Sequence, residues 1–288
     1  FFGRPQNILM ACQGTQVERY LRPAIRGEKM DALAMTEPGA GSDAASLRTQ
    51  ATLDGDHYVV SGSKMFISGA GATDILVTMV RTGDAGPKGI SCLAIDANAE
   101  GIEYGSNLNK MGWNSQPTRE IVFNEVRVPA SRRIGGEGDG FKIAMKGLDG
   151  GRINIATCSI GTAQAALNRS KTYLQERVQF GEALANFQAL QFKLADMATS
   201  LEAAKLITLE AAALKDAHKN FTRQSAMAKL MASKVAVDCA LEAIQIHGGY
   251  GYSKDYPVEK FYRDSKLCTI GEGTTEIQKV VISRNILK

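Results

Sequence analysis

The sequence changes character near Gly140, and this change restricts the possible folds more than any other feature. Before it, short β-branched and apolar runs recur between turn signals, at residues 32–36, 57–61, 75–81, 90–96 and 120–128. After it these runs stop, and three long segments rich in Ala, Leu, Met and Lys follow. Strands gathered in one part of a chain and helices in another are typical of the α+β class. We therefore predict an α+β protein, with a β domain over residues 30–140 and a helical domain over residues 141–288.

The β domain is expected to be compact and mostly antiparallel. Within it, Asp54 and Gly55 form a typical two-residue hairpin turn, and residues 83–89 form a longer Gly/Pro loop. Residues 6–27 precede the domain and have helical periodicity until Pro23 breaks the run, which predicts one or two short helices. Residues 1–29 are therefore treated as a separate N-terminal segment.

The helical domain has apolar residues at helical spacing, which predicts helices that pack as a bundle. Two stripes of four residues follow this spacing: Leu190, Leu194, Met197 and Leu201, and then Leu230, Val237, Leu241 and Ile244. A Gly-rich corner at residues 248–252 ends the third long helix, and a last helix is expected to run towards Lys288.

Composition excludes several classes of protein. The 288 residues contain 34 Lys and Arg against 30 Asp and Glu, a net charge of +4 scattered along the chain, which argues against a nucleic-acid partner. No apolar run is long enough to span a bilayer. Five cysteines without CxxC spacing and three widely separated histidines predict neither a disulfide framework nor a metal site. The unpaired set of cysteines fits a reducing compartment, and no leader pattern stands at Phe1, so the bacterial cytoplasm or the mitochondrial matrix is expected.

The segment GEGTTEIQ, residues 271–278, is the most informative local motif. Thr275 and Gln278 have capping-box spacing, so a helix should begin near Thr274 and leave Glu272 just outside it, between two glycines. A carboxylate in that position can be presented to a ligand. The structural alternative is an acid that complements the helix dipole, and these eight residues alone favour that alternative.

Other local features carry less information singly. Residues 39–44, GAGSDA, match a loose dinucleotide fingerprint, but a hairpin follows where a Rossmann unit needs a helix and a parallel strand. The hydroxyls of Thr36 and Ser42 and the bare glycine amides could still hold polar atoms of a cofactor. An ordinary wide turn is the alternative. Arg177 and Arg152 lie at opposite ends of the first long helix, where arginine is also common for reasons of helix stability.

Taken together, these segments resemble the acyl-CoA dehydrogenase family, from about Leu33 to the C-terminus. The blocks that carry the resemblance occur in the family's order: MTEPGAGSD at 35–43, KMFISGAG at 64–71, RVQFGE at 177–182, QIHGGYGYSKDYPVEKFYRD at 245–264 and GEGTTEIQ at 271–278. Within the family, residues 88–95, 110–119 and 150–163 are most similar to the branch that oxidises isobutyryl-CoA. The resemblance implies a middle antiparallel β domain followed by a C-terminal up-down four-helix bundle, with residues 1–29 as a remnant of an N-terminal helical domain.

The resemblance also implies a function. It implies an FAD enzyme that oxidises the Cα–Cβ bond of a short acyl-CoA thioester in branched-chain or fatty-acid catabolism, works as a homotetramer and passes electrons to an electron-transferring flavoprotein. Glu272 then matches the base that removes the α proton, although an ordinary carboxylate of pKa about 4.3 needs a dry pocket and a polarised thioester to do so.

The family's binding roles transfer residue by residue. The implied FAD contacts are Met35, Thr36, Ser42, Phe66, Ile67, Ser68, Arg177, Gln179, Phe180, Gln188, Gln245, Gly248, Gly249, Thr274 and Glu276, of which Arg177 to Gly249 serve the FAD of a neighbouring subunit. The implied substrate contacts are Ser42, Asp149, Arg152 and Gly273.

Two departures bear on the chemistry. Some relatives carry their base immediately before the arginine that matches Arg152, where this chain has Gly151, and straight-chain enzymes often have Tyr before the base, where this chain has Gly271. The extra room at Gly271 would suit a branched acid. The alternatives are a non-catalytic CoA- or flavin-binding remnant, an acyl-CoA oxidase on the same scaffold, and a nicotinamide-dependent dehydrogenase based on the GAGSDA match alone.

Overall fold

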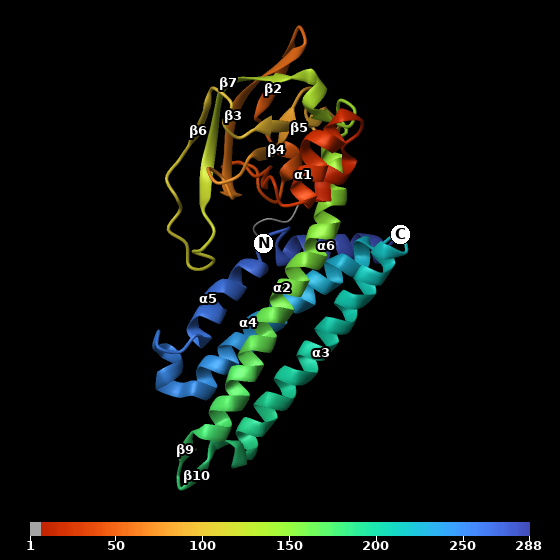
Figure 1. Ribbon diagram of the computed structural model, residues 1–288. Coiled ribbons are helices and arrows are strands. Elements are labelled where there is room, and N and C mark those ends of the chain that lie inside the picture. The colour runs from red at the N-terminus through yellow and green to blue at the C-terminus, as the bar shows by residue number, and fades with distance from the viewer. Residues whose placement is uncertain (1–6) are drawn as a thin grey trace. The chain divides into compact units, whose positions relative to one another are not determined.

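The computed structural model describes residues 7–288, which divide into two compact units (Figure 1). The first contains the described residues up to Lys110 together with Asn114–Leu148, and the second contains Met111–Trp113 and Asp149–Lys288. Residues 111–113 group with the helices because Trp113 donates hydrogen bonds to Asp264, from its backbone N to Oδ1 at 2.7 Å and from Nε1 to the carbonyl oxygen at 2.8 Å. Of the N-terminal segment assigned to residues 1–29, the first six lie outside the described residues.

The first unit is built on an eight-stranded sheet. Its strands are β1 (Asp31–Ala34), β2 (Gln50–Asp54), β3 (His57–Ser68), β4 (Ile75–Arg81), β5 (Ile90–Asp96), β6 (Ile102–Tyr104), β7 (Thr118–Pro129) and β8 (Arg133–Ile134). They are arranged in the order β6-β7-β3-β2-β4-β5-β8, with β1 paired to β4. Among the strand pairs that residues 7–288 form in this sheet, β1–β4 and β2–β4 are parallel and the others antiparallel, so the expectation of a mostly antiparallel β domain is confirmed.

The centre of this sheet is covered on both faces. All but the last residue of β4 and of β5 are buried, and alternate residues enter two different cores, as the two-residue period of a strand requires. One core contains Leu76 and the other contains Ile75, together with the buried side chains of Leu9 and Tyr20 from the N-terminal segment. That segment forms the short helices η1 (Asn7–Ala11), η2 (Val17–Leu21) and α1 (Arg22–Ile25). Short helices were expected there, but the break expected at Pro23 is wrong, because Pro23 lies in the first turn of α1, where its missing N–H costs no hydrogen bond.

The short strands were harder to predict. The predicted hairpin is present, but its two-residue turn is Gly55 and Asp56, one residue later than expected, because Asp54 ends β2 and pairs with His57 of β3. Gly55 adopts φ 62° in this turn. However, β2 is largely exposed, while β6 and β8 have three and two residues. Their hydrogen bonds to neighbouring strands define them, and no local hydrophobic pattern marks them.

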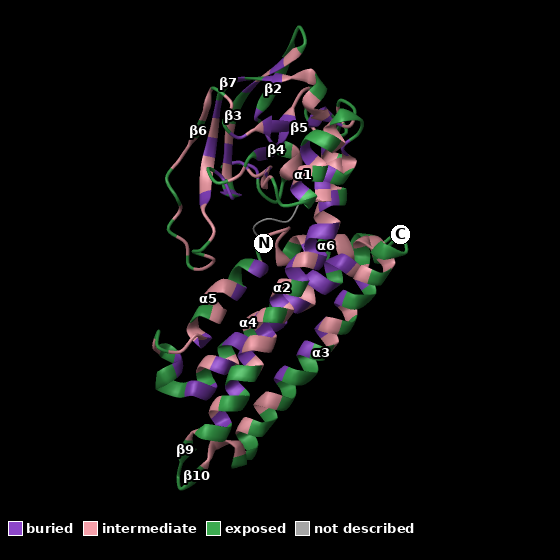
Figure 2. Cartoon of the chain, in the orientation of Figure 1, coloured by how far each residue is buried: buried purple, intermediate pink, exposed green. Residues whose placement is uncertain are grey.

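The second unit is helical. Its helices are α2 (Gly140–Glu176), which begins in the first unit, α3 (Gln188–Asp216), α4 (Thr222–His247), α5 (Val258–Cys268) and α6 (Thr275–Ile286). Between α2 and α3 lie the hairpin strands β9 (Val178–Gln179) and β10 (Glu182–Ala183) and the turn η6 (Leu184–Asn186), and η7 (Gly248–Tyr252) follows α4. Buried and exposed residues alternate along α3 and α4 (Figure 2), as expected for helices with one face in a core.

The two predicted apolar stripes have different outcomes. In α3, Met197 and Leu201 are buried, and Leu190 and Leu194 pack against the same core. In α4 the predicted stripe is wrong, because Leu241 is 46% exposed and, of the four residues, only Ile244 packs against the core. The residues of α4 that form the core are mostly small: Ala228, Ala232, Val235, Ala236, Cys239, Ala243 and Ile246. Small side chains allow α4 to pack closely against its neighbours, and a search for large apolar residues overlooks such a face.

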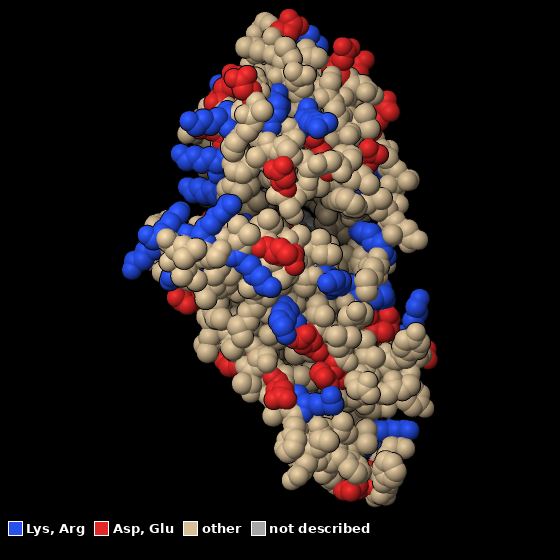
Figure 3. Space-filling model, turned by 180° about the vertical axis from the view of Figure 1, so that it is seen from behind, with Lys and Arg blue, Asp and Glu red and all other residues tan. Residues whose placement is uncertain are grey.

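No helix among the described residues is long and apolar enough to cross a membrane. Lys and Arg side chains are interspersed with Asp and Glu side chains on the face drawn in Figure 3, in line with their scatter along the sequence.

Candidate functional site

Two loop and strand segments of the first unit lie side by side. The backbone N of Met65 in β3 donates to the carbonyl oxygen of Thr36 at 2.8 Å, which joins the segment 35–43 to the segment 64–68. Ser42 and Ser68 are exposed, and Thr36 is partly exposed. The structure thus joins the two motifs whose hydroxyl-bearing residues were predicted to contact a cofactor.

Phe66 is displayed at an irregularity in β3. The pairing of β3 with β7 shifts register between Lys64 and Ile67, and Phe66 adopts φ 60°, a left-handed conformation that costs a residue with a Cβ roughly 1–3 kcal/mol. Its ring is 62% exposed, whereas the side chain of Ile67 is buried in the sheet core. Phe66 can therefore offer a ring to a ligand, and Ile67 can offer only its backbone.

A buried ion pair joins the segment 35–43 to the segment 64–68. Lys64 Nζ lies 2.8 Å from Glu37 Oε1 and also donates to the carbonyl oxygen of Met35 at 3.2 Å. Glu37 accepts hydrogen bonds from the backbone N of Arg48 at 2.6 Å and of Thr49 at 2.8 Å. Burial opposes the charge of Glu37, but the Lys64 ammonium and these hydrogen bonds outweigh it and hold its pKa below the usual value. Burial lowers the pKa of Lys64 to about 8.

Glu272 occupies a constrained turn in the second unit, just before α6. It adopts φ 56° and Gly273 adopts φ 90°, so two consecutive residues are left-handed. The carboxylate of Glu272 lies close to Gly151 of α2: a Cβ added to Gly151 would lie 2.3 Å from Glu272 Oε2. The carboxylate therefore fills the space that a side chain at position 151 would occupy.

The start of α6 differs in detail from the expectation. Thr274 is the N-cap, and its side chain accepts from the backbone N of Ile277 at 3.4 Å. Gln278, which was expected to complete a capping box, instead donates to the carbonyl oxygens of Glu272 and Gly273 at 3.1 and 2.8 Å. Glu276 is exposed.

Asp149 and Arg152 form a buried pair on α2. Arg152 Nη1 donates to Asp149 Oδ1 at 2.6 Å, and Thr222 Oγ1 donates to Asp149 Oδ2 at 2.7 Å. Burial raises the pKa of Asp149, although both hydrogen bonds act in the opposite direction. Arg152 is 4% exposed, and its Nε has no hydrogen-bond partner within residues 7–288. Gly151 lies between these two residues in the sequence, so the pair belongs to the same stretch of α2 as the space filled by Glu272.

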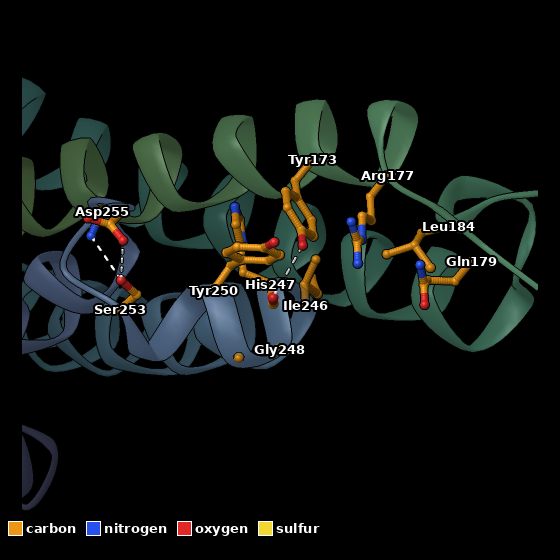
Figure 4. A pocket seen from close by; sticks show the side chains of 11 residues that line it. Tyr173, Arg177, Gln179, Leu184, Ile246, His247, Gly248, Tyr250, Ser253 and Asp255 are labelled. Atoms are coloured by element: carbon orange, nitrogen blue, oxygen red, sulfur yellow. Dashed lines mark hydrogen bonds between the residues drawn. The ribbon is translucent and has the colours of Figure 1, made fainter.

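A hollow of about 540 Å³ lies where α2 ends and α4 turns into η7 (Figure 4). Its lining includes four of the predicted cofactor residues: Arg177, Gln179, Gly248 and Gly249. The guanidinium of Arg177 lies 5.5 Å from the ring centre of Tyr250, a cation–π contact. A Cβ at Gly248 or at Gly249 would meet nothing within 4 Å, so their backbone is accessible.

Three predicted residues lie outside the lining of this hollow. Gln188 and Gln245 are exposed, and Phe180 is 95% exposed at the β9–β10 turn, with φ 55°. Its ring makes an edge contact with Phe187, at 6.2 Å between ring centres.

Two residues near Glu272 were not among the predicted site residues. Gln278 stands in the quoted motif, and only its capping role was considered. Lys229 of α4 is fully buried, and its Nζ donates to the carbonyl oxygen of Gly273 at 2.7 Å. No local signal marks Lys229, because it is one lysine in an Ala-rich helix. A buried lysine can be recognised only once the helix has been packed.

Comparison with known proteins covers both units. A model described as "Acyl-CoA dehydrogenase, middle domain" matches residues 32–126, and one described as "Acyl-CoA dehydrogenase, C-terminal domain" matches residues 138–287.

Individual proteins match along nearly the whole chain. The mitochondrial isobutyryl-CoA dehydrogenase of Bos taurus is 48% identical over 274 residues, which is 95% of this chain and 66% of that protein. The caffeyl-CoA reductase-Etf complex subunit CarC of Acetobacterium woodii is 46% identical over 282 residues, 98% of this chain and 74% of that protein. The solved structure of butyryl-CoA dehydrogenase from Megasphaera elsdenii superposes with a TM-score of 0.96 at 43% identity, covering 98% of this chain and 74% of the other. The chain thus spans about two thirds to three quarters of the length of these proteins.

Proposed function

The chain belongs to the acyl-CoA dehydrogenase family, whose members are FAD-dependent oxidoreductases acting on CH–CH bonds, and from this premise we propose that it dehydrogenates a short acyl-CoA between Cα and Cβ. The observation that carries the proposal is the presentation of Glu272 by a left-handed turn against the bare backbone of Gly151. In this proposal the Glu272 carboxylate takes the α proton of the thioester.

The residues present fit FAD. The exposed ring of Phe66 and the hydroxyls of Thr36, Ser42 and Ser68 suit contacts with a flavin ring, and the hollow at Arg177 offers a cation and free glycine backbone to phosphate groups. The chemistry that FAD supplies when bound is acceptance of the hydride from the β carbon.

The residues proposed to orient the acyl-CoA lie in the second unit. Removing an α proton requires stabilisation of the negative charge that develops on the thioester oxygen. The Asp149–Arg152 pair lies next to Gly151 in α2, and the Arg152 Nε without a partner among the described residues is a donor available to a bound ligand. We propose that this pair orients the acyl-CoA beside Glu272.

A branched substrate of the isobutyryl type is the preferred one. The bovine relative is by its name an isobutyryl-CoA dehydrogenase, and the residue before the base is Gly271. A Cβ at Gly271 would meet nothing closer than the carbonyl oxygen of Leu267 at 3.7 Å, so there is room beside the base.

Partners are proposed on two grounds. The ring of Phe180 is 95% exposed, which supports a second copy of the chain as its partner, and the family resemblance supports a homotetramer as the assembly. The relative from Acetobacterium woodii is by its name a subunit of a complex with Etf, which supports an electron-transferring flavoprotein as electron acceptor. The proposed location stays the bacterial cytoplasm or the mitochondrial matrix, and the bovine relative is by its name mitochondrial.

One assay tests the proposed function. Turnover of isobutyryl-, 2-methylbutyryl- and butyryl-CoA is measured with an artificial electron acceptor, and isobutyryl-CoA is expected to give the highest kcat/KM. A preference for butyryl-CoA would reject the branched substrate, and no turnover of any of the three would reject the activity.

The reverse direction is a second candidate, because a relative at 46% identity is named a reductase. The same preparation is given the 2-enoyl-CoA and a chemically reduced electron donor. Faster reduction of the enoyl-CoA than oxidation of the acyl-CoA, at matched driving force, would favour this alternative.

A further inference from the structure

A fully buried lysine contacts the turn that carries Glu272, and the proposed function gives it no role. Lys229 lies in α4, and its Nζ donates to the carbonyl oxygen of Gly273 at 2.7 Å. Burying an ammonium group is unfavourable unless it is well hydrogen-bonded. The hydrogen bond to Gly273, the residue that follows Glu272, offsets part of this cost.

The turn needs support from outside itself. A left-handed residue with a side chain persists only where the surroundings determine its conformation, and Glu272 is such a residue. Two fully buried side chains supply that support, because Gln278 Nε2 bonds the carbonyl oxygens of both Glu272 and Gly273, and Lys229 bonds the second of these oxygens. Of the two, only Lys229 is charged, and a charge-assisted hydrogen bond is the stronger kind.

We infer that Lys229 is a positioning residue for the catalytic base: its ammonium holds the Gly273 carbonyl and so fixes the left-handed turn that aims the Glu272 carboxylate. The inference rests on the proposed function, because it assumes that Glu272 is the base. It assigns Lys229 no direct contact with the substrate or with FAD.

The surroundings of Lys229 make this role dependent on pH. The groups that act on it are Cys268 of α5, Arg152 of α2, Glu272, and Glu276 of α6. Burial, and after it the positive charge of Arg152, lower the pKa of Lys229 to about 8, although Cys268, Glu272 and Glu276 act in the opposite direction. Lys229 is therefore charged at neutral pH and loses its charge in mildly alkaline solution, which weakens its bond to Gly273.

The experiment compares Lys229→Met, Lys229→Arg and the control Lys234→Met. Lys234 is on the same helix, but its side chain is 75% exposed and pairs with Asp238. For Lys229→Met we expect kcat to fall roughly 10- to 100-fold, the loss typical of a misplaced catalytic group, with KM and the bound FAD per subunit nearly unchanged. Lys229→Arg should recover part of kcat, and Lys234→Met should match the wild type.

The pH profile adds a readout that a purely structural role would not change. Wild-type kcat should decline above about pH 8 as Lys229 loses its proton, and this decline should be absent from Lys229→Met. If Lys229→Met does not fold, the pH profile of wild-type kcat tests the role of Lys229. The variant Gln278→Met then tests whether the turn needs support at all, since it removes the other two hydrogen bonds to the turn. Gln278→Met should then lower kcat without lowering bound FAD.

The outcomes separate the two claims. Wild-type kcat in a folded, FAD-loaded Lys229→Met protein would overturn the role of Lys229, and so would a wild-type kcat that does not decline above about pH 8. If Glu272→Gln has no effect on turnover, the proposed function itself fails.

Discussion

At the scale of single residues, the Glu37–Lys64 pair in the first unit and Lys229 in the second have a similar role. In each case a buried charged side chain is hydrogen-bonded to a segment that is proposed to contact a ligand. Lys64 lies two residues before Phe66, and Glu37 follows Thr36. Their bond of 2.8 Å, with no exposure at Lys64 and little at Glu37, ties the two segments together. Motif matching found both segments in the sequence but could not reveal the pair, because 27 residues separate its members.

Removing one partner of this pair should be costly. Glu37→Gln leaves the Lys64 ammonium buried without its carboxylate, so we expect a loss of about 3–5 kcal/mol in the free energy of unfolding at pH 7. Urea unfolding measures it. The double variant Glu37→Gln with Lys64→Met should recover part of this loss. If the double variant has the same free energy of unfolding as Glu37→Gln alone, Glu37 and Lys64 are not coupled.

The sign of the pH dependence follows from the lowered pKa of Glu37. Its contribution to stability is fully present above the ordinary value of 4.5 and is lost as the pH falls through the lower pKa of the folded state. The difference between wild type and Glu37→Gln should therefore shrink on acidification below pH 4.5. A difference that grows on acidification would contradict this assignment.

The contact between Gly151 and Glu272 gives a second prediction. In Gly151→Ala the new Cβ would lie 2.3 Å from the present position of Glu272 Oε2, and the end of a flexible side chain can move away cheaply. We expect nearly unchanged Tm and bound FAD but a fall in kcat of roughly 10-fold or more. Gly161→Ala is the control, because it lies in the same helix with nothing within 4 Å of the new Cβ. Equal kcat in both variants would contradict the contact.

Substrate choice can be tested at Gly271. An added Cβ there meets only the carbonyl oxygen of Leu267, at 3.7 Å, so a larger side chain can be built in. Gly271→Tyr should lower kcat/KM for isobutyryl-CoA relative to butyryl-CoA by roughly 10-fold, while Gly271→Ala should change this ratio little. The ratio is measured by competition between the two substrates. An unchanged ratio in Gly271→Tyr would mean that the space beside the base does not select the branch.

At the scale of secondary-structure elements, a buried helix face was predicted correctly where large apolar residues mark it in the sequence. The stripe on α3 was predicted because Met197 and Leu201 are large and lie on the buried face. The stripe on α4 was not, because Ala232 and Ala236 lie in the core while Leu241 is largely exposed. The identity of the core face is set there by close helix packing, which single-chain periodicity does not record.

This difference predicts that two substitutions in α4 destabilise the protein to different extents. Ala236 is fully buried, so Ala236→Leu should overpack the core and lower stability by about 1–3 kcal/mol. Leu241→Ala removes a half-exposed side chain and should cost less than about 1 kcal/mol. Thermal unfolding ranks the two. A larger loss of stability in Leu241→Ala than in Ala236→Leu would favour the buried face predicted from the sequence.

At the scale of the whole molecule, the α+β class and the family were predicted because several motif blocks occur in one order, and the family and the fold are confirmed. FAD, predicted from the same blocks, is the cofactor of this family. The individual site residues stay predictions. Arg177, Gln179, Gly248 and Gly249 do line one hollow, but the sequence could not show this, because α3 and α4 separate the two motifs along the chain.

The claim on which all of this depends is that Glu272 takes a proton from the carbon next to a thioester. The most direct test mixes the yellow, FAD-loaded protein with isobutyryl-CoA in the absence of oxygen and follows the flavin absorbance near about 450 nm. The wild-type protein should bleach within the time of one turnover. Glu272→Gln should retain its flavin and remain yellow, whereas bleaching of Glu272→Gln at the wild-type rate would show that another group removes the proton.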